Sequence, residues 1–265
     1  MNENRTHEHD KVKLRQKEAE NGMLNPQNSK KIINIEEKIS YCLQISKKII
    51  NFVRFYVHTL YKYITTDLRT MAEFTREEIL KIKAVVLYIL QQFPTGIDYI
   101  HLFKIMYFAQ RRHLATYGIP LIQESFDAHK NGPVPEYTYR ALRTLEGKCS
   151  RYPNMQWVAP SVSITEQCGH PIFTLKEGVQ YDHEELSVSN TEILDLIIRQ
   201  CKDMPAYALS DISHEDEAYR KAWERFEQTG ENSLMPMVEI AAAGGASDVM
   251  QNIIRERLLV QNALE

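Results

Sequence analysis

The sequence lacks the patterns on which most enzymes depend for their chemistry. No P-loop, nucleophile elbow or dinucleotide-binding glycine pattern occurs in its 265 residues. The four cysteines, at positions 42, 149, 168 and 201, form no CxxC pair. Cys168 and His170 are a local pair, but no second pair follows at a spacing that suits zinc. We therefore expect no metal, no cofactor and no enzymatic activity.

Long apolar runs are also missing. No uninterrupted stretch of about 18 apolar residues occurs, so a transmembrane span is not expected. No signal-peptide pattern leads the chain, and together with the scattered cysteines this indicates a reducing, cytoplasmic environment. A hydrophobic content of 43% is ordinary for a soluble globular protein, and the length is sufficient to bury a sizeable core.

Positive charge is scarce outside the N-terminal quarter. Residues 1–70 carry 13 Lys and Arg against 8 Asp and Glu, whereas residues 71–265 carry 19 against 27. A protein that coats nucleic acid needs clustered positive charge, so we expect no nucleic-acid partner. An acidic body can attract a basic protein partner, because opposite potentials speed encounter.

The N-terminal 70 residues divide into two parts. Residues 1–30 are polar and without apolar periodicity, so we expect them to be disordered. Residues 31–66 repeat isoleucine, leucine and valine at helical intervals beside lysines, which favours a basic amphipathic helix extending to about residue 70. Such a helix could lie on a membrane, dock on a partner or cover the domain.

A simpler explanation for residues 31–66 is that they are translated from AT-rich DNA upstream of the gene, since their commonest residues have AT-rich codons. Met71 then resembles a natural start, immediately before Thr75 and Glu78, which form a capping-box pattern. We favour a working domain that begins near Met71. We expect it to span residues 71–230 and to be followed by C-terminal helices in residues 231–265.

The rest of the pattern is mainly helical. Helices are predicted from Thr75 to Phe93, from a capping-box pattern at Ser189–Glu192, and again after Ser213 with Trp223 and Phe226 on the buried side. Residues 156–182 alternate apolar residues with turn formers, which predicts a small antiparallel hairpin or sheet. Gly244–Gly245 separates two final helices. The predicted fold class is α+β, predominantly helical.

The stretch from His101 to Leu145 is the most informative part of the chain. An aromatic-rich helix ends at Gly118, which can take a positive φ, and Pro120 prevents the helix from restarting. Residues 121–128 are expected to be extended, and residues 131–135 to form a rigid Asn-Gly-Pro-Val-Pro turn. The polar residues of the helix are expected to share its wetter side; these are Lys104, Gln110, Arg111 and Arg112.

This block resembles the Panacea domain, also called the SocA-like domain, which occurs in bacterial and phage antitoxins. The resemblance is carried by Lys104-Ile105-Met106-Tyr107-Phe108-Ala109-Gln110, His113-Leu114, Tyr117-Gly118, Pro120-Leu121, Glu124, Ala128 and Gly132-Pro133-Val134. A second piece, Leu209–His214 followed by Glu217-Ala218-Tyr219, resembles the C-terminal element of the family. The chain departs from the family pattern at Arg111, Arg112, His129, Pro135 and Tyr219.

The resemblance implies a cytoplasmic antitoxin that neutralises a cognate protein toxin encoded by an adjacent gene, with no catalytic residues of its own. It also leaves open a proteolytic adaptor that delivers the toxin to a protease, with a protease or chaperone as a further partner. A histidine- or metal-dependent enzyme is a minor alternative. The motif residues given a structural role are Lys104, Tyr107, Gln110, Gly118, Pro120 and His214.

Two groups of residues are candidates for contact with the partner. The Asn131–Pro135 turn could present a preorganised surface, because its prolines restrict the backbone; an equally good interpretation is that it merely positions two elements. Arg111 and Arg112 could contact an acidic partner, although a solvated helix face explains them better. The tentative partner-binding residues are Arg111, Arg112, Asn131, Gly132, Pro133, Val134 and Pro135.

A possible acid–base cluster is formed by Asp211, His214 and Glu215, since a carboxylate can orient an imidazole for proton transfer. The structural interpretation is favoured. In it, Ser213 caps the next helix, the acidic residues lie at its positive N-terminus, and His214 bonds a loop. His101 and His113 are twelve residues apart on one predicted helix, which places them about 18 Å apart along its axis, too far to share a metal.

Overall fold

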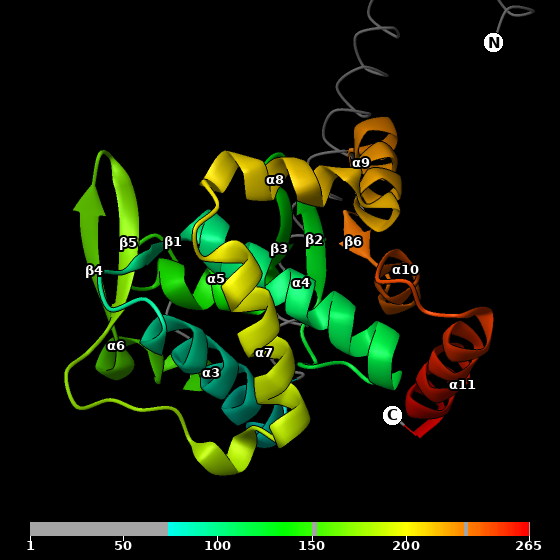
Figure 1. The fold of residues 1–265 in the computed structure, drawn as a ribbon, viewed down its shortest axis with the longest axis horizontal. Coiled ribbons are helices and arrows are strands. Elements are labelled where there is room, and N and C mark those ends of the chain that lie inside the picture. Colours follow the sequence, from blue (N-terminus) through cyan, green and yellow to red (C-terminus); the bar gives the residue numbers. More distant parts are fainter. Residues whose placement is uncertain (1–73, 150–152, 231–232, 265) are drawn as a thin grey trace, which may run out of the picture. The chain divides into compact units, whose positions relative to one another are not determined.

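The computed structural model describes residues 74–149, 153–230 and 233–264, all within the compact unit Arg69–Glu265 (Figure 1). Three predictions lie outside the described residues: disorder of residues 1–30, a basic amphipathic helix in residues 31–70, and a start near Met71. In order, the elements are α3 Arg76–Gln91, β1 Ile97–Asp98, α4 Tyr99–Tyr117, β2 Phe126–His129, β3 Gly132–Pro135, α5 Glu136–Arg143, η1 Pro153–Met155, α6 Val158–Ser161, β4 Val162–Gln167, β5 His170–Leu175, η2 His183–Glu185, α7 Val188–Cys201, α8 Ala206–Glu215, α9 Glu217–Thr229, β6 Leu234–Met235, α10 Met237–Ala243 and α11 Asp248–Leu264.

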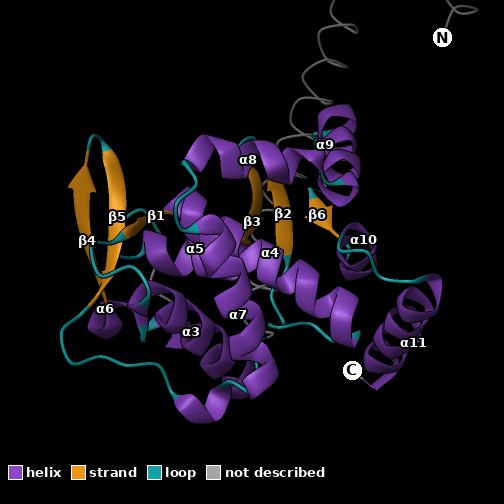
Figure 2. Cartoon of the chain, viewed as in Figure 1, coloured by secondary structure: helices purple, strands orange, loops and turns teal. Residues whose placement is uncertain are grey.

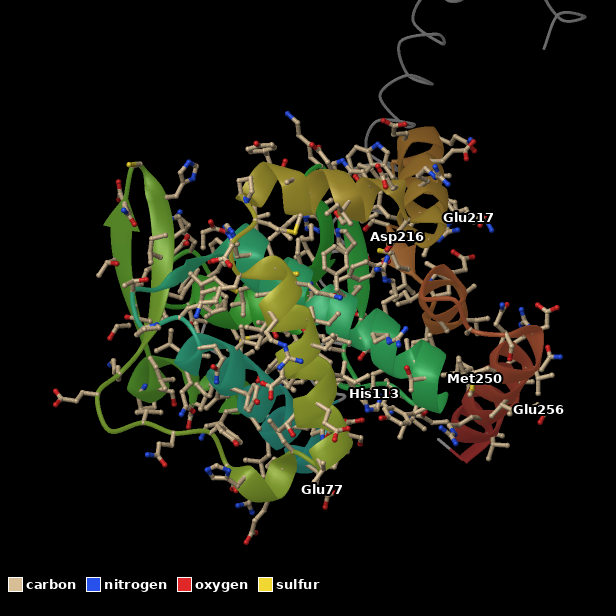
Figure 3. All side chains as sticks on the ribbon, viewed as in Figure 1. Glu77, His113, Asp216, Glu217, Met250 and Glu256 are labelled. Carbon is tan, nitrogen blue, oxygen red and sulfur yellow. The ribbon has the colours of Figure 1, made fainter. Side chains whose placement is uncertain are left out.

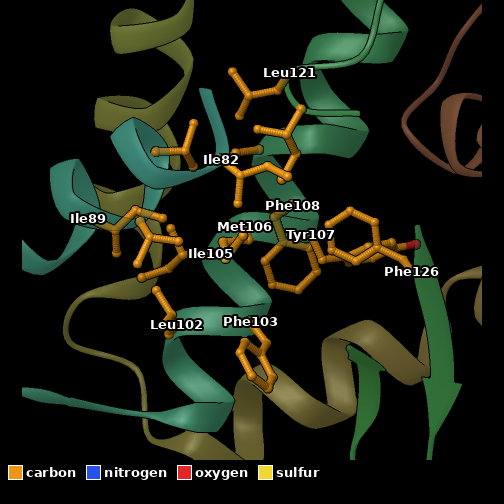
Figure 4. Packing of buried hydrophobic residues seen from close by; sticks show 14 of the residues in the cluster. Ile82, Ile89, Leu102, Phe103, Ile105, Met106, Tyr107, Phe108, Leu121 and Phe126 are labelled. Atoms are coloured by element: carbon orange, nitrogen blue, oxygen red, sulfur yellow. The ribbon is translucent and has the colours of Figure 1, made fainter. Parts of the chain in front are cut away.

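Helix α4 is the central element of the fold. It contacts α3, α7, α8, α10 and strands β1, β3 and β5. Its residues from Leu102 to Gln110 are all buried, and Figure 4 shows side chains from this run packed with those of neighbouring elements. A helix with neighbours on every side must be apolar or internally satisfied on every side. The prediction that Lys104 and Gln110 lie on a wet side is therefore wrong, because the helix has no wet side at those positions.

Local signals set several helix ends. Thr75 caps α3 in the predicted capping box with Glu78. At the end of α4, Gly118 has φ 65° and closes the helix in the left-handed conformation, as predicted. The capping box of α7 is formed by Ser187 and Asn190 rather than by Ser189 and Glu192, so this helix begins earlier than expected.

The strands form two small antiparallel sheets, with the orders β1–β5–β4 and β3–β2–β6 (Figure 2). The predicted hairpin in residues 156–182 is β4–β5, and its tight turn has Cys168 at φ 51°. The second sheet contains an error of prediction. Gly132–Pro135 is the buried strand β3, and the turn that joins it to β2 lies at Lys130 and Asn131. The α+β, predominantly helical class is confirmed.

The C-terminal third also differs from expectation in detail. Ser213 does not begin a helix but lies buried inside α8, and the next helix, α9, begins after Asp216. Trp223 is partly buried on α9, as expected, whereas Phe226 is exposed. The two helices expected in the C-terminal segment are α10 and α11; in the same segment, β6 pairs with β2 and α10 packs on α4.

A helix that crosses a bilayer needs about 20 mostly apolar residues. Among the residues that the structure describes, no helix is long and apolar enough to cross a membrane.

A buried carboxyl group supplies the cap that helix α5 lacks. Pro135 occupies its N-cap position and has no side-chain oxygen to offer. Glu124, fully buried in the loop before β2, takes over this role, since its Oε1 accepts from the Thr138 backbone N–H (2.6 Å) and its Oε2 from the Thr138 hydroxyl (2.8 Å). Burial raises the pKa of Glu124 to about 8, so the group is mostly protonated at neutral pH.

We therefore expect Glu124→Ala to lower the free energy of unfolding by about 3 kcal/mol, because it leaves the Thr138 N–H unsatisfied and opens a cavity. Glu124→Gln should cost about 1 kcal/mol or less, because a neutral amide can keep both bonds. Urea unfolding at pH 7 measures both variants. If Gln proved as damaging as Ala, an ionised carboxylate would be required at this position.

Candidate functional site

The family-type residues of α4, β3 and α8 meet at one point, called here the α4–β3–α8 junction and defined by Lys104, Gly132, Pro133 and Ser213. The Lys104 ammonium donates to the Pro133 carbonyl oxygen at 3.0 Å, and the side chain is 1% exposed. Burial lowers the pKa of Lys104 to about 7. Among the described residues, no carboxylate forms an ion pair with it.

Gly132 is a glycine because two other elements approach its backbone closely. Its φ is 97°, which side-chain-bearing residues rarely adopt. A Cβ at this position would overlap with Ser213 Oγ and would lie 2.6 Å from Lys104 Cε. Ser213 is itself fixed, since its hydroxyl donates to the Ser210 carbonyl oxygen at 2.7 Å. The glycine thus serves the contact between β3, α4 and α8, rather than a turn.

His214 and Tyr219 extend the junction to α9. Their rings stack with centroids 4.6 Å apart and an interplanar angle of 15°, and the Tyr219 hydroxyl donates to the His129 carbonyl oxygen at 2.9 Å. Burial, followed by the charge of Lys104, lowers the pKa of His214. In the described part of the chain, no hydrogen bond joins Asp211 to His214, and His214 Nε2 is buried without a partner. The two stacked rings join α8 to α9, and His214 and Asp211 lack the geometry of an acid–base pair.

The remaining motif residues of α4 hold the segment that follows the helix. Gln110 accepts from the backbone N–H groups of Leu121 and Ile122 at 2.8 and 3.1 Å and donates to the Ile122 carbonyl oxygen at 3.0 Å. Pro120 lies between Gly118 and this anchored segment. Gln110 therefore fixes the segment that follows the end of α4 at Gly118, which explains why the Gln110 side chain is completely buried.

Tyr107 is buried at the centre of α4. Its ring contacts those of Phe108 and Phe126, with centroids 5.6 and 5.7 Å apart. Burial, with a further contribution from the charge of Asp216, raises the pKa of the Tyr107 hydroxyl. Tyr107 thus belongs to the core between α4 and β2.

The tentative partner-binding residues lie in different environments. Arg111 forms an ion pair with Asp216 at 2.5 Å and lies over the Phe108 ring, so it connects α4 to the start of α9. Arg112 and Asn131 are exposed. Gly132, Pro133, Val134 and Pro135 are all buried. The exposed turn expected there is absent, because β3 is covered by α4 and α8.

Two histidines of α4 are engaged in separate internal contacts. His101 lies between Asp98 Oδ2 and the Met204 carbonyl oxygen, at 2.8 and 2.9 Å, so both of its ring nitrogens donate. His113 donates from Nδ1 to the Ile119 carbonyl oxygen at 2.8 Å and accepts at Nε2 from Asn190 at 2.9 Å. Over the described residues, no group of three His, Cys, Asp or Glu side chains could hold a metal ion.

A known protein family matches the region of the chain that contains these residues. Residues 102–220 match the family model described as antitoxin SocA-like, Panacea domain. This segment of the chain is similar to the SocA-like Panacea domain. It runs from the second turn of α4 into α9 and contains the whole α4–β3–α8 junction. Neither the curated proteins nor the solved structures gave a match.

The match of residues 102–220 to an antitoxin family model supports an antitoxin role in general and implies a protein toxin as partner. It also suggests a role other than catalysis. Sequence reasoning gave Lys104 and His214 a structural role and placed Gly132 in a candidate binding turn. It missed the contacts of Ser213, which was expected to cap a helix, and of Glu124. Both were visible as family-type residues, yet only the three-dimensional contacts show what they bind.

Substitution of Gly132 tests the junction. Gly132→Ala should lower the free energy of unfolding by about 3 kcal/mol, through backbone strain and the overlap with Ser213 and Lys104. The matched control is Gly147→Ala, where φ is 68° and no atom lies within 4 Å, so strain alone should cost about 1 kcal/mol. Chemical denaturation measures both. Equal losses of unfolding free energy in the two variants would show that the close approach of Ser213 and Lys104 to Gly132 does not affect stability.

The contacts of His101 predict a pH dependence of stability. The hydrogen bond to Asp98 raises the pKa of His101 against the opposing effect of burial. Its stabilising contribution should therefore be complete below about pH 6.5, the unfolded pKa, and should be lost as the pH rises through the higher folded pKa. We expect the free energy of unfolding of the wild type to exceed that of His101→Gln by about 1 kcal/mol at pH 5.5, and by less at pH 8.5.

The exposed His170 on β5 provides a control substitution, His170→Gln, for general effects of removing a histidine. Denaturant titrations of the three proteins across this pH range are required. A gap for His101→Gln that widens with rising pH would contradict the assignment.

Proposed function

We propose that this chain is an antitoxin that binds a cognate protein toxin, encoded by an adjacent gene, and neutralises it by covering the region with which the toxin acts. The observation that carries the proposal is the match of residues 102–220 to the Panacea domain. Binding is stoichiometric in this mechanism, and no bond of the toxin is made or broken.

The use of the motif residues supports a binding scaffold. Lys104, Gln110 and Glu124 direct their polar groups to the backbone of neighbouring segments, and Gly132 and Ser213 touch each other. These contacts hold the backbone of neighbouring segments in place. The motif therefore shapes a domain whose outer surface is available for recognition.

The proposal assigns the toxin to a surface of exposed apolar side chains. Val249 and Leu259 on α11 are 70% and 68% exposed, and Tyr117 and Ile119 are exposed at the end of α4. Helix α11 is held to this end of α4, because Arg257 donates to the Gly118 carbonyl oxygen at 2.9 Å and Met250 packs on Gly118 (Figure 3). Exposed apolar side chains gathered on neighbouring elements are typical of protein-binding sites.

The negative charge of residues 71–265 favours a basic toxin as the partner. Residues 71–265 carry eight more acidic than basic residues, and an acidic surface speeds encounter with a basic toxin. Exposed Arg112 and Asn131 remain candidates for polar contacts at the rim of an interface. The alternative is a proteolytic adaptor that delivers the bound toxin to a protease.

Coexpression with the product of the neighbouring gene tests the proposed function. The chain should restore growth to cells that express the toxin and should copurify with it at a fixed stoichiometry. Rescue should persist in cells that lack the major cytoplasmic proteases; its loss there would favour the adaptor. Rescue without any physical complex would contradict direct neutralisation.

A matched pair of valines tests the α11 surface. Val249 and Val188 are 70% and 74% exposed, and each lies in the first turn of a helix, α11 and α7 respectively. Val249→Lys should weaken toxin binding at least about tenfold, as expected for a charge placed in an apolar contact, whereas Val188→Lys should not. Titration calorimetry measures both. Equal affinities would remove α11 from the interface.

A further inference from the structure

A cavity of about 410 Å³ opens beside the first turns of α4. Its walls come from α4, the turn between β2 and β3, helix α5 with the segment after it, and β5 (elements in Figure 1). This volume lies within the range of sites that hold small organic ligands. The residues on which the argument depends are Lys104, His129, Lys130, Tyr139, Arg143 and Glu146.

The cavity collects positive charge in an otherwise acidic body. Of the described residues that line it, Lys104, Lys130, Arg143 and Lys148 are basic and Glu146 alone is acidic. Lys148 forms an ion pair with Glu146 at 2.7 Å, so the negative charge is already matched. Three basic side chains remain without a carboxylate in the lining, although residues 71–265 as a whole are acidic. The cavity is thus locally basic.

Lys104 is the least usual of these cations. An ammonium group has three N–H donors, and the structure gives one of them to the Pro133 carbonyl oxygen. The ammonium is buried and forms no ion pair with a carboxylate among the described residues. Burial lowers the pKa of His129 in the same wall, the charge of Asp127 raises it, and the charge of Lys104 lowers it. A buried cation without a counter-ion is costly. An anion in the cavity would supply the missing partner.

Aromatic rings form part of the same wall. Tyr99, Phe103 and Tyr139 line the cavity, and Arg143 lies over the Tyr139 ring at 5.3 Å. Tyr99 is held in place, because its hydroxyl donates to Glu146 at 3.0 Å. Rings beside cations suit a ligand that joins a planar ring to an anionic group.

We propose that this cavity binds a nucleoside monophosphate or a closely similar nucleotide. Lys104, Lys130 and Arg143 hold its phosphate, and its base packs against Tyr99 and Tyr139. The site lies apart from the α11 surface proposed for the toxin. It does not depend on toxin binding, and each can be tested without the other.

Titration calorimetry of the full chain with AMP, adenosine and inorganic phosphate tests the site. AMP should bind saturably and more tightly than either fragment. Lys104→Met keeps a long unbranched side chain but removes the charge, and it should weaken AMP binding about tenfold or more. The control Lys83→Met removes a cation from α3 outside the cavity and should leave the affinity unchanged.

Arg143→Met serves as a second variant, because Lys104 also supports the fold; thermal melting establishes that each variant is folded. It too should weaken AMP binding about tenfold. Absence of saturable AMP binding by the wild type would overturn the proposal. So would adenosine or phosphate binding as tightly as AMP, or folded Lys104→Met and Arg143→Met variants that both bind AMP with wild-type affinity.

Discussion

The fold depends on the close approach of three backbone segments at the α4–β3–α8 junction. Lys104 reaches the Pro133 carbonyl oxygen, and Gly132 leaves room for Ser213, so that β3 lies between two helices without a side chain to separate them. These residues are far apart in sequence. Their contact places the β2–β3–β6 sheet against α4 and orients α8, from which the stacked His214 and Tyr219 continue to α9.

Much of the fold was predictable because its signals are local. The capping box at Thr75, the end of α4 at Gly118 and the β4–β5 hairpin each depend on residues within a few positions of one another. The errors arose where distant segments decide the environment. Nothing near Lys104 or Gln110 in the sequence reveals that α4 is enclosed on all sides, and the glycine and prolines of β3 are typical of a turn.

The candidate site was predicted in part for the same reason. The resemblance identified Lys104 and His214 as structural, but it could not show that their partners are a carbonyl oxygen and a tyrosine ring. Glu124 illustrates the limit further, because it caps a helix that begins after an intervening hairpin. Exposure likewise depends on how distant segments pack. In the folded chain Arg112 and Asn131 lie at the surface, whereas β3 is buried.

In the proposed function, the motif residues hold the interior together and the surface recognises the toxin. The most direct test measures toxin rescue and the free energy of unfolding together for a substitution of His214, whose imidazole Nε2 is buried without a partner among the described residues. If the domain is a scaffold, His214→Phe, which keeps the stack on Tyr219, should retain rescue in proportion to its stability. A His214→Phe variant as stable as the wild type but without rescue would show that the imidazole itself acts, and would contradict the account.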